Sequence, residues 1–203
     1  MIARDNITGL ILAGGRGSRM GGTDKGLQPF QGTPMVQHTL RRLAPQTGAL
    51  LINANRNLDR YAAFGVPVVP DIIPDFAGPL AGMLAGLAQC KTRWIVTAPC
   101  DTPFLPVDLV ERLACAIEAD DAALAIPVTV DADGRRQLQP VFCMMPVTAA
   151  ASLRAYLDAG QRRIETWVTG QRLAQVLFDD AAAFANLNTL DDLRQHEAGA
   201  RPD

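Results

Sequence analysis

Short runs of apolar residues alternate with helical patterns along most of the chain. The runs ITGLILAG, ALLINAN, VPVV and RWIVTAP cover residues 7–14, 49–55, 66–69 and 93–99. They lack the period-two polar alternation of a half-exposed sheet, so we interpret them as buried strands. Because strands and helices alternate, the pattern predicts βαβ units and a largely parallel sheet covered by helices, which is an α/β fold.

Three further segments carry apolar residues at the i, i+3, i+4 and i+7 spacing of a helix. The first follows Thr33 and Pro34, which we expect to cap and open it, the second opens at Pro79, and the third follows Pro106. Their apolar positions are Met35, Val36, Leu40 and Leu43; Leu80, Met83, Leu84 and Leu87; and Leu109, Val110, Leu113 and Ile117. Each predicted helix therefore has one side suited to packing on a sheet.

The second half of the chain is less regular. AALAIPVTV at residues 122–130 and LQPVFCMM at 138–145 have the composition of strands, and they flank DADGRR at 131–136, whose Asp-Gly pair is a turn signal. We expect a hairpin or an antiparallel excursion there. No repeat or low-complexity linker divides the chain, so we expect one domain over residues 1–197 and a polar tail at 198–203.

Composition narrows the class of protein. Of 203 residues, 48% are hydrophobic and 20% are charged, and 19 basic against 21 acidic residues give a net charge of −2. This charge provides no positive field for nucleic acid or an anionic membrane, and no apolar run approaches the ~18 residues of a membrane span. The 4 cysteines form no CxxC pair, which favours a reducing compartment. We expect a cytoplasmic monomer without nucleic-acid or membrane partners.

The loop after the first predicted strand concentrates glycines and cations. LAGGRGSRMGGTDKG, residues 12–26, contains six glycines together with Arg16, Arg19 and Lys25. Glycines let the backbone approach a phosphate and direct N–H groups at its oxygens, while the cations balance its charge. A nucleoside triphosphate suits this loop. The alternative is a solvated connection without a ligand, which would need neither so many glycines nor three cations.

Two widespread phosphate-binding loops do not fit these residues. A P-loop has Lys and then Ser or Thr after its second glycine, whereas Leu27 follows Gly26. A dinucleotide-binding loop needs a third glycine or an alanine where Met20 stands, three residues after Gly17. The sequence therefore disfavours both a P-loop enzyme and a dehydrogenase.

A carboxylate follows the fourth predicted strand in PCDTPF, residues 99–104. Ligands of open α/β sheets bind beyond the carboxyl ends of the strands. Asp101 could hold Mg²⁺ there, because this ion prefers oxygen ligands and takes few from protein when phosphates supply others. The alternative is helix capping by Asp101 or Thr102 ahead of Pro103. We favour the metal role.

Two further polar pairs follow strands. Asn53 and Asn55 end the second strand, where an amide can donate to and accept from a base edge, although asparagine is also common in turns. Asp71 and Asp75 follow the third strand and could contact a base or ribose, or cap the helix at Pro79. These residues alone leave the alternatives open.

Taken together, the segments resemble those of molybdenum cofactor guanylyltransferases. LAGGRGSRMGGTDKGL, NANRN, PDIIPDFAGPLAG, PCDTPFL, QPVF and FANLNT occur in the order of that family and span nearly the whole chain. The first block alone is shared with sugar-nucleotide pyrophosphorylases and cytidylyltransferases. Cytidylyltransferase relatives tend to carry LAAG where this chain has LAGG at residues 12–15, which favours guanine. The resemblance implies a three-layer α/β/α nucleotidyltransferase fold of the glycosyltransferase-A-like, Rossmann-like type with a mostly parallel mixed sheet.

The resemblance also implies roles for individual residues. Lys25 would contact the phosphates of GTP, and Asp101 would bind both the nucleotide and Mg²⁺. Asn53 and Asp71 would help to recognise GTP. The loop residues implied to lie against the nucleotide are Leu12, Ala13, Gly14 and Gly15.

By the same resemblance, the second substrate would lie against later segments of the chain. Arg162 and Arg163 in GQRRIETW would pair with its phosphate, and Asn186 and Asn188 in NLNT would contact it. The alternatives are a basic helical surface for the arginines and an N-cap role for Asn188 or Thr189. Each structural alternative is at least as plausible from the residues alone.

The implied reaction transfers GMP from GTP to the terminal phosphate of molybdenum-molybdopterin and releases pyrophosphate. A phosphate monoester with a second pKa of ~6 is already largely ionised at neutral pH, so the reaction needs no protein base. The protein must still position the two substrates and neutralise their negative charge. We assign these tasks to Arg19, Lys25 and Asp101 with Mg²⁺. We expect transient contacts with cofactor-synthesis proteins and molybdoenzyme chaperones.

Two other functions stay open at the level of sequence. A related enzyme could use CTP or activate a sugar phosphate, and binding to a panel of nucleotides would separate it from a GTP enzyme. A nucleotide-binding regulator would keep the glycine-rich loop but form no product with any phosphorylated acceptor. Lys25 and Asp101 argue against the regulator, because both belong to the implied chemistry.

Overall fold

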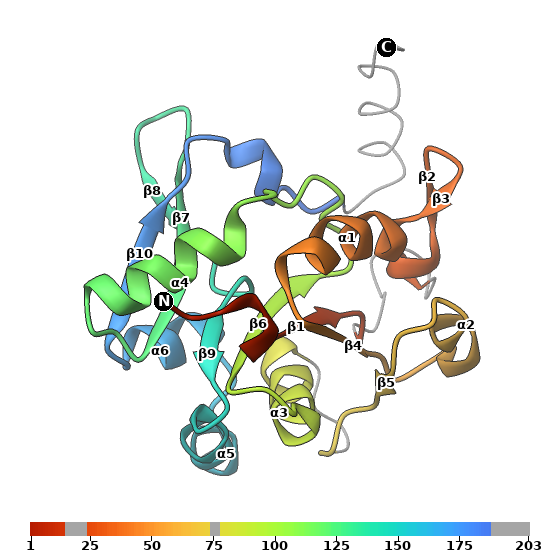
Figure 1. Ribbon diagram of the computed structural model, residues 1–203, viewed down its shortest axis with the longest axis horizontal. Helices are drawn as coiled ribbons and strands as arrows, with labels where there is room; N and C mark the ends of the chain where they lie inside the picture. Colours follow the sequence, from red (N-terminus) through yellow and green to blue (C-terminus); the bar gives the residue numbers. More distant parts are fainter. Residues whose placement is uncertain (15–23, 74–77, 188–203) are drawn as a thin grey trace.

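The computed structural model describes residues 1–14, 24–73 and 78–187. Its main sheet has the strand order β10-β7-β9-β6-β1-β4-β5, and β8 pairs with β7 (Figure 1). The strands of this sheet are β1 (Ile7–Leu12), β4 (Ala49–Asn53), β5 (Val68–Val69), β6 (Trp94–Pro99), β7 (Leu124–Val130), β8 (Arg136–Leu138), β9 (Met144–Pro146) and β10 (Leu173–Leu177). A second sheet pairs β2 (Pro29–Phe30) with β3 (Thr33–Pro34).

Helices lie on both faces of the main sheet, so the architecture has three layers (Figure 1). The helices are α1 (Met35–Leu43), α2 (Leu58–Ala62), α3 (Pro79–Gln89), α4 (Leu109–Ala119), α5 (Ala149–Asp158) and α6 (Ile164–Thr169). Single 3₁₀ turns are η1 (Arg4–Asn6), η3 (Lys25–Leu27), η4 (Ala44–Gln46) and η5 (Ala181–Phe184). The predicted three-layer α/β/α fold is confirmed.

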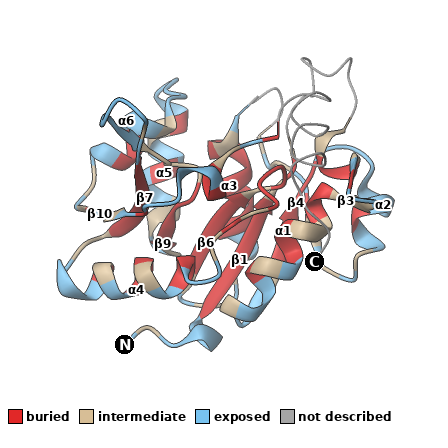
Figure 2. Ribbon diagram, turned by 90° about the horizontal axis from the view of Figure 1, so that it is seen from above, coloured by how far each residue is buried: buried red, intermediate tan, exposed pale blue. Residues whose placement is uncertain are grey.

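Each face of the sheet has its own hydrophobic core. Ile7 and Ile11 of β1 belong to one core with residues of α1 and α4, whereas Leu10 belongs to the other with residues of α3, α5 and α6. Figure 2 shows the buried strands in the centre and the exposed residues on the outer sides of the helices. Burial of both faces explains the nearly continuous apolar character of the strands.

The parallel pairing of β1 aligns three strand ends at one edge of the sheet. Leu12 is in register with Asn53 of β4 on one side and with Pro99 of β6 on the other. The chain leaves all three strands in the same direction, so the glycine-rich loop, Asn55 and Asp101 start from neighbouring points. This is the carboxyl edge, where an α/β sheet binds ligands.

The second half is mixed, as the irregular sequence pattern predicts. β8 pairs antiparallel with β7, and the turn between them contains Gly134 at φ 79°. β9 runs antiparallel to both β6 and β7. The predicted hairpin around residues 131–136 is therefore confirmed, while the other pairs of the main sheet are parallel.

Two local predictions were wrong. Thr33 and Pro34 form β3, because Phe30 and Thr33 pair across a tight turn. Pro34 is therefore the N-cap residue of α1 and not its first helical residue, and the helix begins at Met35. Residues 138–145 do not form one strand: the amide of Phe142 bonds to the carbonyl of Gln139 in a turn, so β8 and β9 are separate. Pro140 in this turn has no amide to give to a ladder, which is a physical reason for the interruption.

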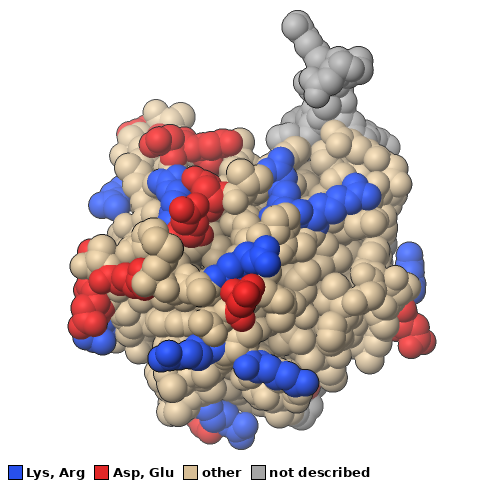
Figure 3. Space-filling view, in the orientation of Figure 1, with Lys and Arg blue, Asp and Glu red and all other residues tan. Residues whose placement is uncertain are grey.

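The face seen in Figure 3 carries basic and acidic side chains side by side. In the part of the chain that the structure describes, no helix is both long and apolar enough to cross a membrane. The polar tail predicted at residues 198–203 lies outside the described residues.

Candidate active site

Asparagine and aspartate side chains form a network beyond the ends of β4 and β5. Asn53, the last residue of β4, is 2% exposed and donates from Nδ2 to Asp71 Oδ1 at 2.8 Å and to the carbonyl of Val69 at 3.1 Å. Asn55 donates to Asp71 Oδ2 at 2.7 Å, and its own Oδ1 accepts from the Asp71 amide at 2.8 Å. Both oxygens of the Asp71 carboxylate are thus bound by amides, which fixes its orientation.

The end of β1 and helix α3 pack closely on this network. A β-carbon on Gly14 would lie 2.9 Å from Asn53 Oδ1 and 2.9 Å from Asn55 Nδ2. A β-carbon on Gly82 of α3 would overlap Asn53 Oδ1 and lie 2.9 Å from Leu12 Cδ2. Glycine at these two positions lets the end of β1 and helix α3 approach the buried amide of Asn53, so the geometry of the network depends on this close backbone packing.

Lys25 and Asp101 meet beyond the ends of β1 and β6. Lys25 Nζ lies 3.3 Å from Asp101 Oδ2, and the two side chains are 22% and 12% exposed. Burial raises the pKa of the Asp101 carboxyl, and the Lys25 ammonium opposes this rise. The contact joins residues 76 positions apart in the chain, so the fold brings the end of the glycine-rich segment to the end of β6.

Neither Asp101 nor Asp71 caps a helix. The N-cap residue of α4 is Asp108, so the capping alternative for Asp101 is wrong. The N-cap residue of α3 is Gly78, which removes the same alternative for Asp71. Thr102 instead donates its hydroxyl to the carbonyl of Pro99 at 2.9 Å and so closes the turn that presents Asp101.

Three of the predicted site residues, Gly15, Arg19 and Asn188, lie outside the described residues. So do Arg16, Asp75 and Thr189 of the sequence argument, which belong to the segments 15–23, 74–77 and 188–203. Their predicted roles stay predictions. Leu12, Ala13 and Gly14 are described, and the Ala13 amide donates to the carbonyl of Asn53 at 2.8 Å, which places the start of the loop beside the network.

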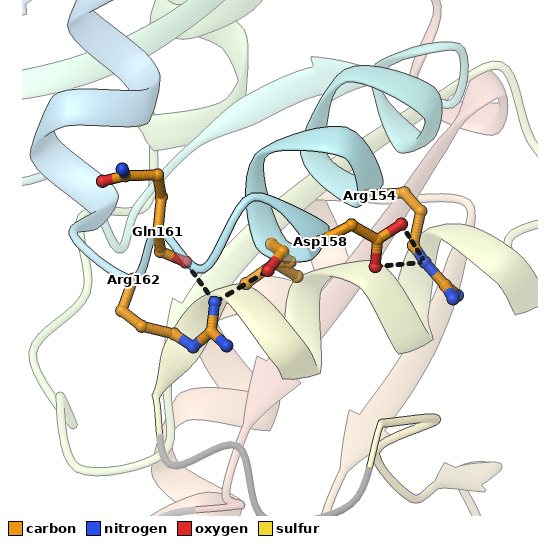
Figure 4. Close-up of polar contacts among 5 residues, drawn as sticks. Arg154, Asp158, Gln161 and Arg162 are labelled. Atoms are coloured by element: carbon orange, nitrogen blue, oxygen red, sulfur yellow. Dashed lines mark hydrogen bonds and ion pairs between the residues drawn. The ribbon is translucent and has the colours of Figure 1, made fainter.

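The two arginines predicted for the second substrate follow α5. The Nη1 of Arg162 donates to the carbonyl of Leu157 at 2.8 Å and to that of Gln161 at 2.6 Å (Figure 4). These contacts bind one carbonyl in the last turn of α5 and one in the loop after it, and they favour a structural role for this guanidinium. Arg163 is exposed, and its carbonyl accepts from the hydroxyl of Tyr156 at 2.9 Å.

The segment of Asn186 lies near the centre of the site. The amide of Leu187 donates to the carbonyl of Asp101 at 3.0 Å, although 86 positions separate the two residues. Asn186, next to Leu187, is therefore brought to the end of β6, and its predicted contact with the second substrate stays a prediction. The sequence offered no periodic signal for the Leu187 contact.

Two further residues near the site were missed by sequence reasoning. Tyr61 and Asn57 bind the carboxylate of Asp24, the neighbour of Lys25 in the chain. Asn57 belongs to NANRN, so its position after β4 was a usable signal. Tyr61 lies within a short helix and nothing in the local pattern marks it.

The carboxyl edge fits a magnesium ion that nucleotide phosphates help to bind. Among residues 1–14, 24–73 and 78–187, no group of three or more His, Cys, Asp or Glu could hold a metal. Mg²⁺ in nucleotide sites takes one or two protein carboxylates and completes its shell with phosphate oxygens and water. Asp101 presents a carboxylate at this sheet edge, and its role as a magnesium ligand stays a prediction.

A family model described as the MobA-like NTP transferase domain matches residues 9–176. The chain belongs to this family. It is 76% identical over 199 residues to the molybdenum cofactor guanylyltransferase of Cupriavidus pinatubonensis, an alignment that covers 98% of this chain and 100% of that protein. It is 57% identical to the protein of the same name from Bordetella pertussis, over 96% and 98% of the two chains. The predicted family resemblance is confirmed.

Solved structures support the fold of this MobA-like transferase. The molybdopterin-guanine dinucleotide biosynthesis protein A of Archaeoglobus fulgidus has a TM-score of 0.75 at 22% identity, over 94% of this chain and 97% of that one. A 4-diphosphocytidyl-2C-methyl-D-erythritol synthase of Anaerococcus prevotii has a TM-score of 0.73 at 13% identity, over 95% and 96%. At such identities the likeness concerns the nucleotidyltransferase fold alone.

Proposed function

We propose that this MobA-like transferase moves GMP from GTP to the terminal phosphate of molybdopterin, with release of pyrophosphate. Relatives of 56–76% identity that bear the name molybdenum cofactor guanylyltransferase support this activity. The structural observation that carries it is the contact of Lys25 with Asp101 at the same sheet edge as the Asn53–Asp71–Asn55 network. This edge presents a cation, a carboxylate that would hold Mg²⁺ and a set of directed polar groups, as nucleotidyl transfer requires.

The network of Asn53, Asn55 and Asp71 is assigned to the nucleoside. Hydrogen bonds hold the Asp71 carboxylate and the Asn53 amide in place before any ligand binds, so little freedom is lost when a base or ribose docks. A carboxylate oxygen has a second lone pair and can still accept from a ligand donor. The start of the loop, Leu12 to Gly14, lies on the same network and provides backbone against the nucleotide.

Lys25 and Asp101 are assigned to the triphosphate. The incoming phosphate monoester is already ionised, so the protein must bring two anions together and offset their repulsion. Lys25 contributes a positive charge aimed at the same point as Asp101, and Arg19 of the loop is the third residue of this group. Asp101 would hold the magnesium ion, which when bound neutralises phosphate charge. Charged groups that are oriented before the reaction stabilise the transition state more than groups that must reorient during it.

Arg163, Asn186 and Asn188 are the residues we assign to the pterin substrate, with Arg162 as a weaker member. Asn186 is brought to Asp101 by the Leu187 contact, which supports its assignment. β9 ends beside Trp94 at the amino edge of the sheet, and α5 then carries the chain back, so the arginines follow toward the carboxyl edge. We place the enzyme in the cytoplasm as a monomer of one domain, in transient contact with cofactor-synthesis proteins and molybdoenzyme chaperones.

Calorimetric titration tests the nucleotide assignment first. The protein is titrated with GTP, CTP, ATP and UTP, each with and without Mg²⁺. Selective binding of GTP that strengthens with Mg²⁺ is the expected result, followed by formation of the guanine dinucleotide from GTP and molybdopterin. A preference for CTP would contradict the assignment to GTP while leaving the fold in place, and no binding of any nucleotide would contradict the whole phosphate argument.

A further inference from the structure

Asp24, the residue before Lys25, has its carboxylate in an unusual environment. It stands at the N-cap position of η3, where an aspartate commonly bonds to the amides of its own helix, but its side chain makes no such bond. Its Oδ1 instead accepts from the hydroxyl of Tyr61 at 2.5 Å, and its Oδ2 accepts from Nδ2 of Asn57 at 3.0 Å. These partners lie 37 and 33 residues further along the chain. The carboxylate is thus bound to the segment around α2.

Both donors are held in place by the fold. Tyr61 is 0% exposed and belongs to the core that packs against α1 and α4. Burial raises the pKa of its hydroxyl, so the group stays protonated and keeps donating. Asn57 precedes α2 in the left-handed conformation, at φ 52°, which asparagine adopts more readily than most residues. Tyr61 is thus fixed by the core, whereas Asn57 is exposed and is held by its backbone conformation and by its bond to Asp24.

Gly26 fixes the chain on the other side of Lys25. A β-carbon at this position would lie 2.6 Å from the Tyr61 hydroxyl and 3.1 Å from Cys100 Sγ. The backbone of residues 24–26 therefore passes between Tyr61 and the end of β6, where Cys100 immediately precedes Asp101. Lys25 extends from this enclosed backbone to the Asp101 carboxylate.

We propose that Tyr61 and Asn57 are positioning residues for Lys25, because they hold Asp24 and thereby fix the backbone from which the ammonium reaches Asp101 and the phosphates. The inference rests on the proposed function in assigning Lys25 to the triphosphate. The ammonium of lysine sits on a flexible four-carbon stem and loses much rotamer freedom when it is placed. A fixed backbone leaves the Lys25 side chain less conformational freedom to lose when GMP passes from GTP to the acceptor phosphate.

The test uses two variants that remove one donor each. Tyr61→Phe keeps the ring in the core and deletes only the hydroxyl. Asn57→Gly deletes the amide and leaves a residue to which the left-handed conformation is natural. Each change is made in the parent chain and in Lys25→Ala, and kcat, KM and the dissociation constant of magnesium GTP are measured. Thr8→Val is the control, because it removes a buried hydroxyl bonded to Thr92 at 2.8 Å, at the amino end of β1.

Positioning predicts that the donor variants act through Lys25. We expect Tyr61→Phe to lower kcat/KM by about tenfold and Asn57→Gly by about threefold in the parent chain, with kcat carrying most of the loss. In Lys25→Ala both changes should have less than a twofold effect, since the side chain that they position is gone. Thr8→Val should lower the melting temperature without changing kcat.

Additive losses would overturn the inference. If Tyr61→Phe and Asn57→Gly reduce kcat equally in both backgrounds, or if they only lower the melting temperature as Thr8→Val does, the contacts to Asp24 are merely structural. Should Tyr61→Phe fail to fold, Asn57→Gly alone decides the question. A parent chain that binds GTP without transferring GMP would contradict the proposed function, and coupling of the variants in GTP affinity would still test the positioning of Lys25. Absence of both transfer and GTP binding would overturn both proposals.

Discussion

The two halves of the carboxyl edge use their polar side chains in different ways. Around β1, β4 and β6, polar groups from distant parts of the chain bind one another, as in the Lys25–Asp101 pair and the contacts of Asp24. Around α5 and α6 the arginine side chains make local contacts: Arg154 pairs with Asp158 one helical turn away, and Arg162 binds carbonyls one to five residues before it (Figure 4).

The difference indicates where the site is prepared in advance. Long-range bonds between partly buried groups fix side chains relative to the sheet. The half of the edge around β1, β4 and β6, to which we assign the nucleotide and which we call the nucleotide half, is therefore part of the fold itself. Exposed local pairs contribute little stability and can rearrange around a ligand. We therefore expect substitutions in the first half to change chemistry strongly, and those in the second half to change substrate affinity or local stability.

The largest effect is expected from Asp101→Ala and Lys25→Ala. Removal of one preorganised charged group costs about 10²–10³-fold in turnover, because charge developing on the phosphates is no longer offset. Asp101→Ala should remove most of the magnesium-dependent turnover, and a circular dichroism spectrum should show the fold intact. Steady-state kinetics at saturating GTP measures both variants. Near-normal turnover of Asp101→Ala, or a loss below tenfold in kcat/KM for Lys25→Ala, would break the comparison between the two halves.

A pair of glycine variants on α3 sharpens the claim that the nucleotide half is built into the fold. Gly82→Ala places a methyl group against Asn53 Oδ1 and should displace the amide from Asp71. We expect GTP to bind about tenfold to hundredfold more weakly, together with a loss of about 1–3 kcal/mol in the free energy of unfolding. Calorimetry and denaturant unfolding measure the two effects.

Gly86→Ala is the matched control, one turn along the same helix. Its methyl group would meet the Leu10 side chain in the core and leave Asn53 untouched. The variant should lose a similar free energy of unfolding and bind GTP like the parent. Equal losses of GTP affinity in both variants would show that α3 as a whole, and not the Asn53 contact, determines affinity.

The half of the carboxyl edge around α5 and α6 is tested with two adjacent arginines. Arg162→Ala removes the hydrogen bonds to the carbonyls of Leu157 in α5 and Gln161 in the following loop, and it should lower the free energy of unfolding by about 0.5–1.5 kcal/mol. Arg163→Ala should leave stability unchanged and raise the KM for the pterin substrate about two- to fivefold, as for an exposed charge pair. The KM for GTP should stay constant in both. A larger effect of Arg162 than of Arg163 on the pterin KM would reverse these assignments.

The same division shows how far the sequence could predict this molecule. Buried strands with both faces covered are continuous apolar runs, so β1, β4 and β6 and the side to which they deliver Asp101 could be predicted. The contact of Tyr61 with Asp24 could not, because it depends on how α2 packs beside β5 and the chain after the loop. Likewise, Leu187 reaches Asp101 through a segment without periodic structure, and only the fold brings the two together.

The smallest effect is expected in the hairpin between β7 and β8, whose polar contacts are also local. Asp131 Oδ1 accepts from the amides of Arg135 at 2.8 Å and Asp133 at 3.0 Å, and Oδ2 accepts from Gln137 at 3.2 Å. The amide of Arg135 above all holds the pKa of the Asp131 carboxyl below its ordinary value of 3.8. Asp131→Ala should therefore lower the melting temperature slightly.

The pH dependence of this change in melting temperature follows from the lowered pKa of Asp131. The ionised carboxylate stabilises the folded state at every pH above 3.8, and this contribution is lost as the pH falls through the lower pKa of the folded state. The melting-temperature difference between the parent and Asp131→Ala should be constant from neutrality down to about pH 3.8, shrink as the pH falls from there to the lower pKa of the folded state, and vanish below that pKa. Asp133→Ala removes the same charge while keeping the backbone amide that binds Asp131, so it should match the parent throughout. If Asp133→Ala reproduces the loss, general surface charge stabilises the turn and the hydrogen bonds of Asp131 do not.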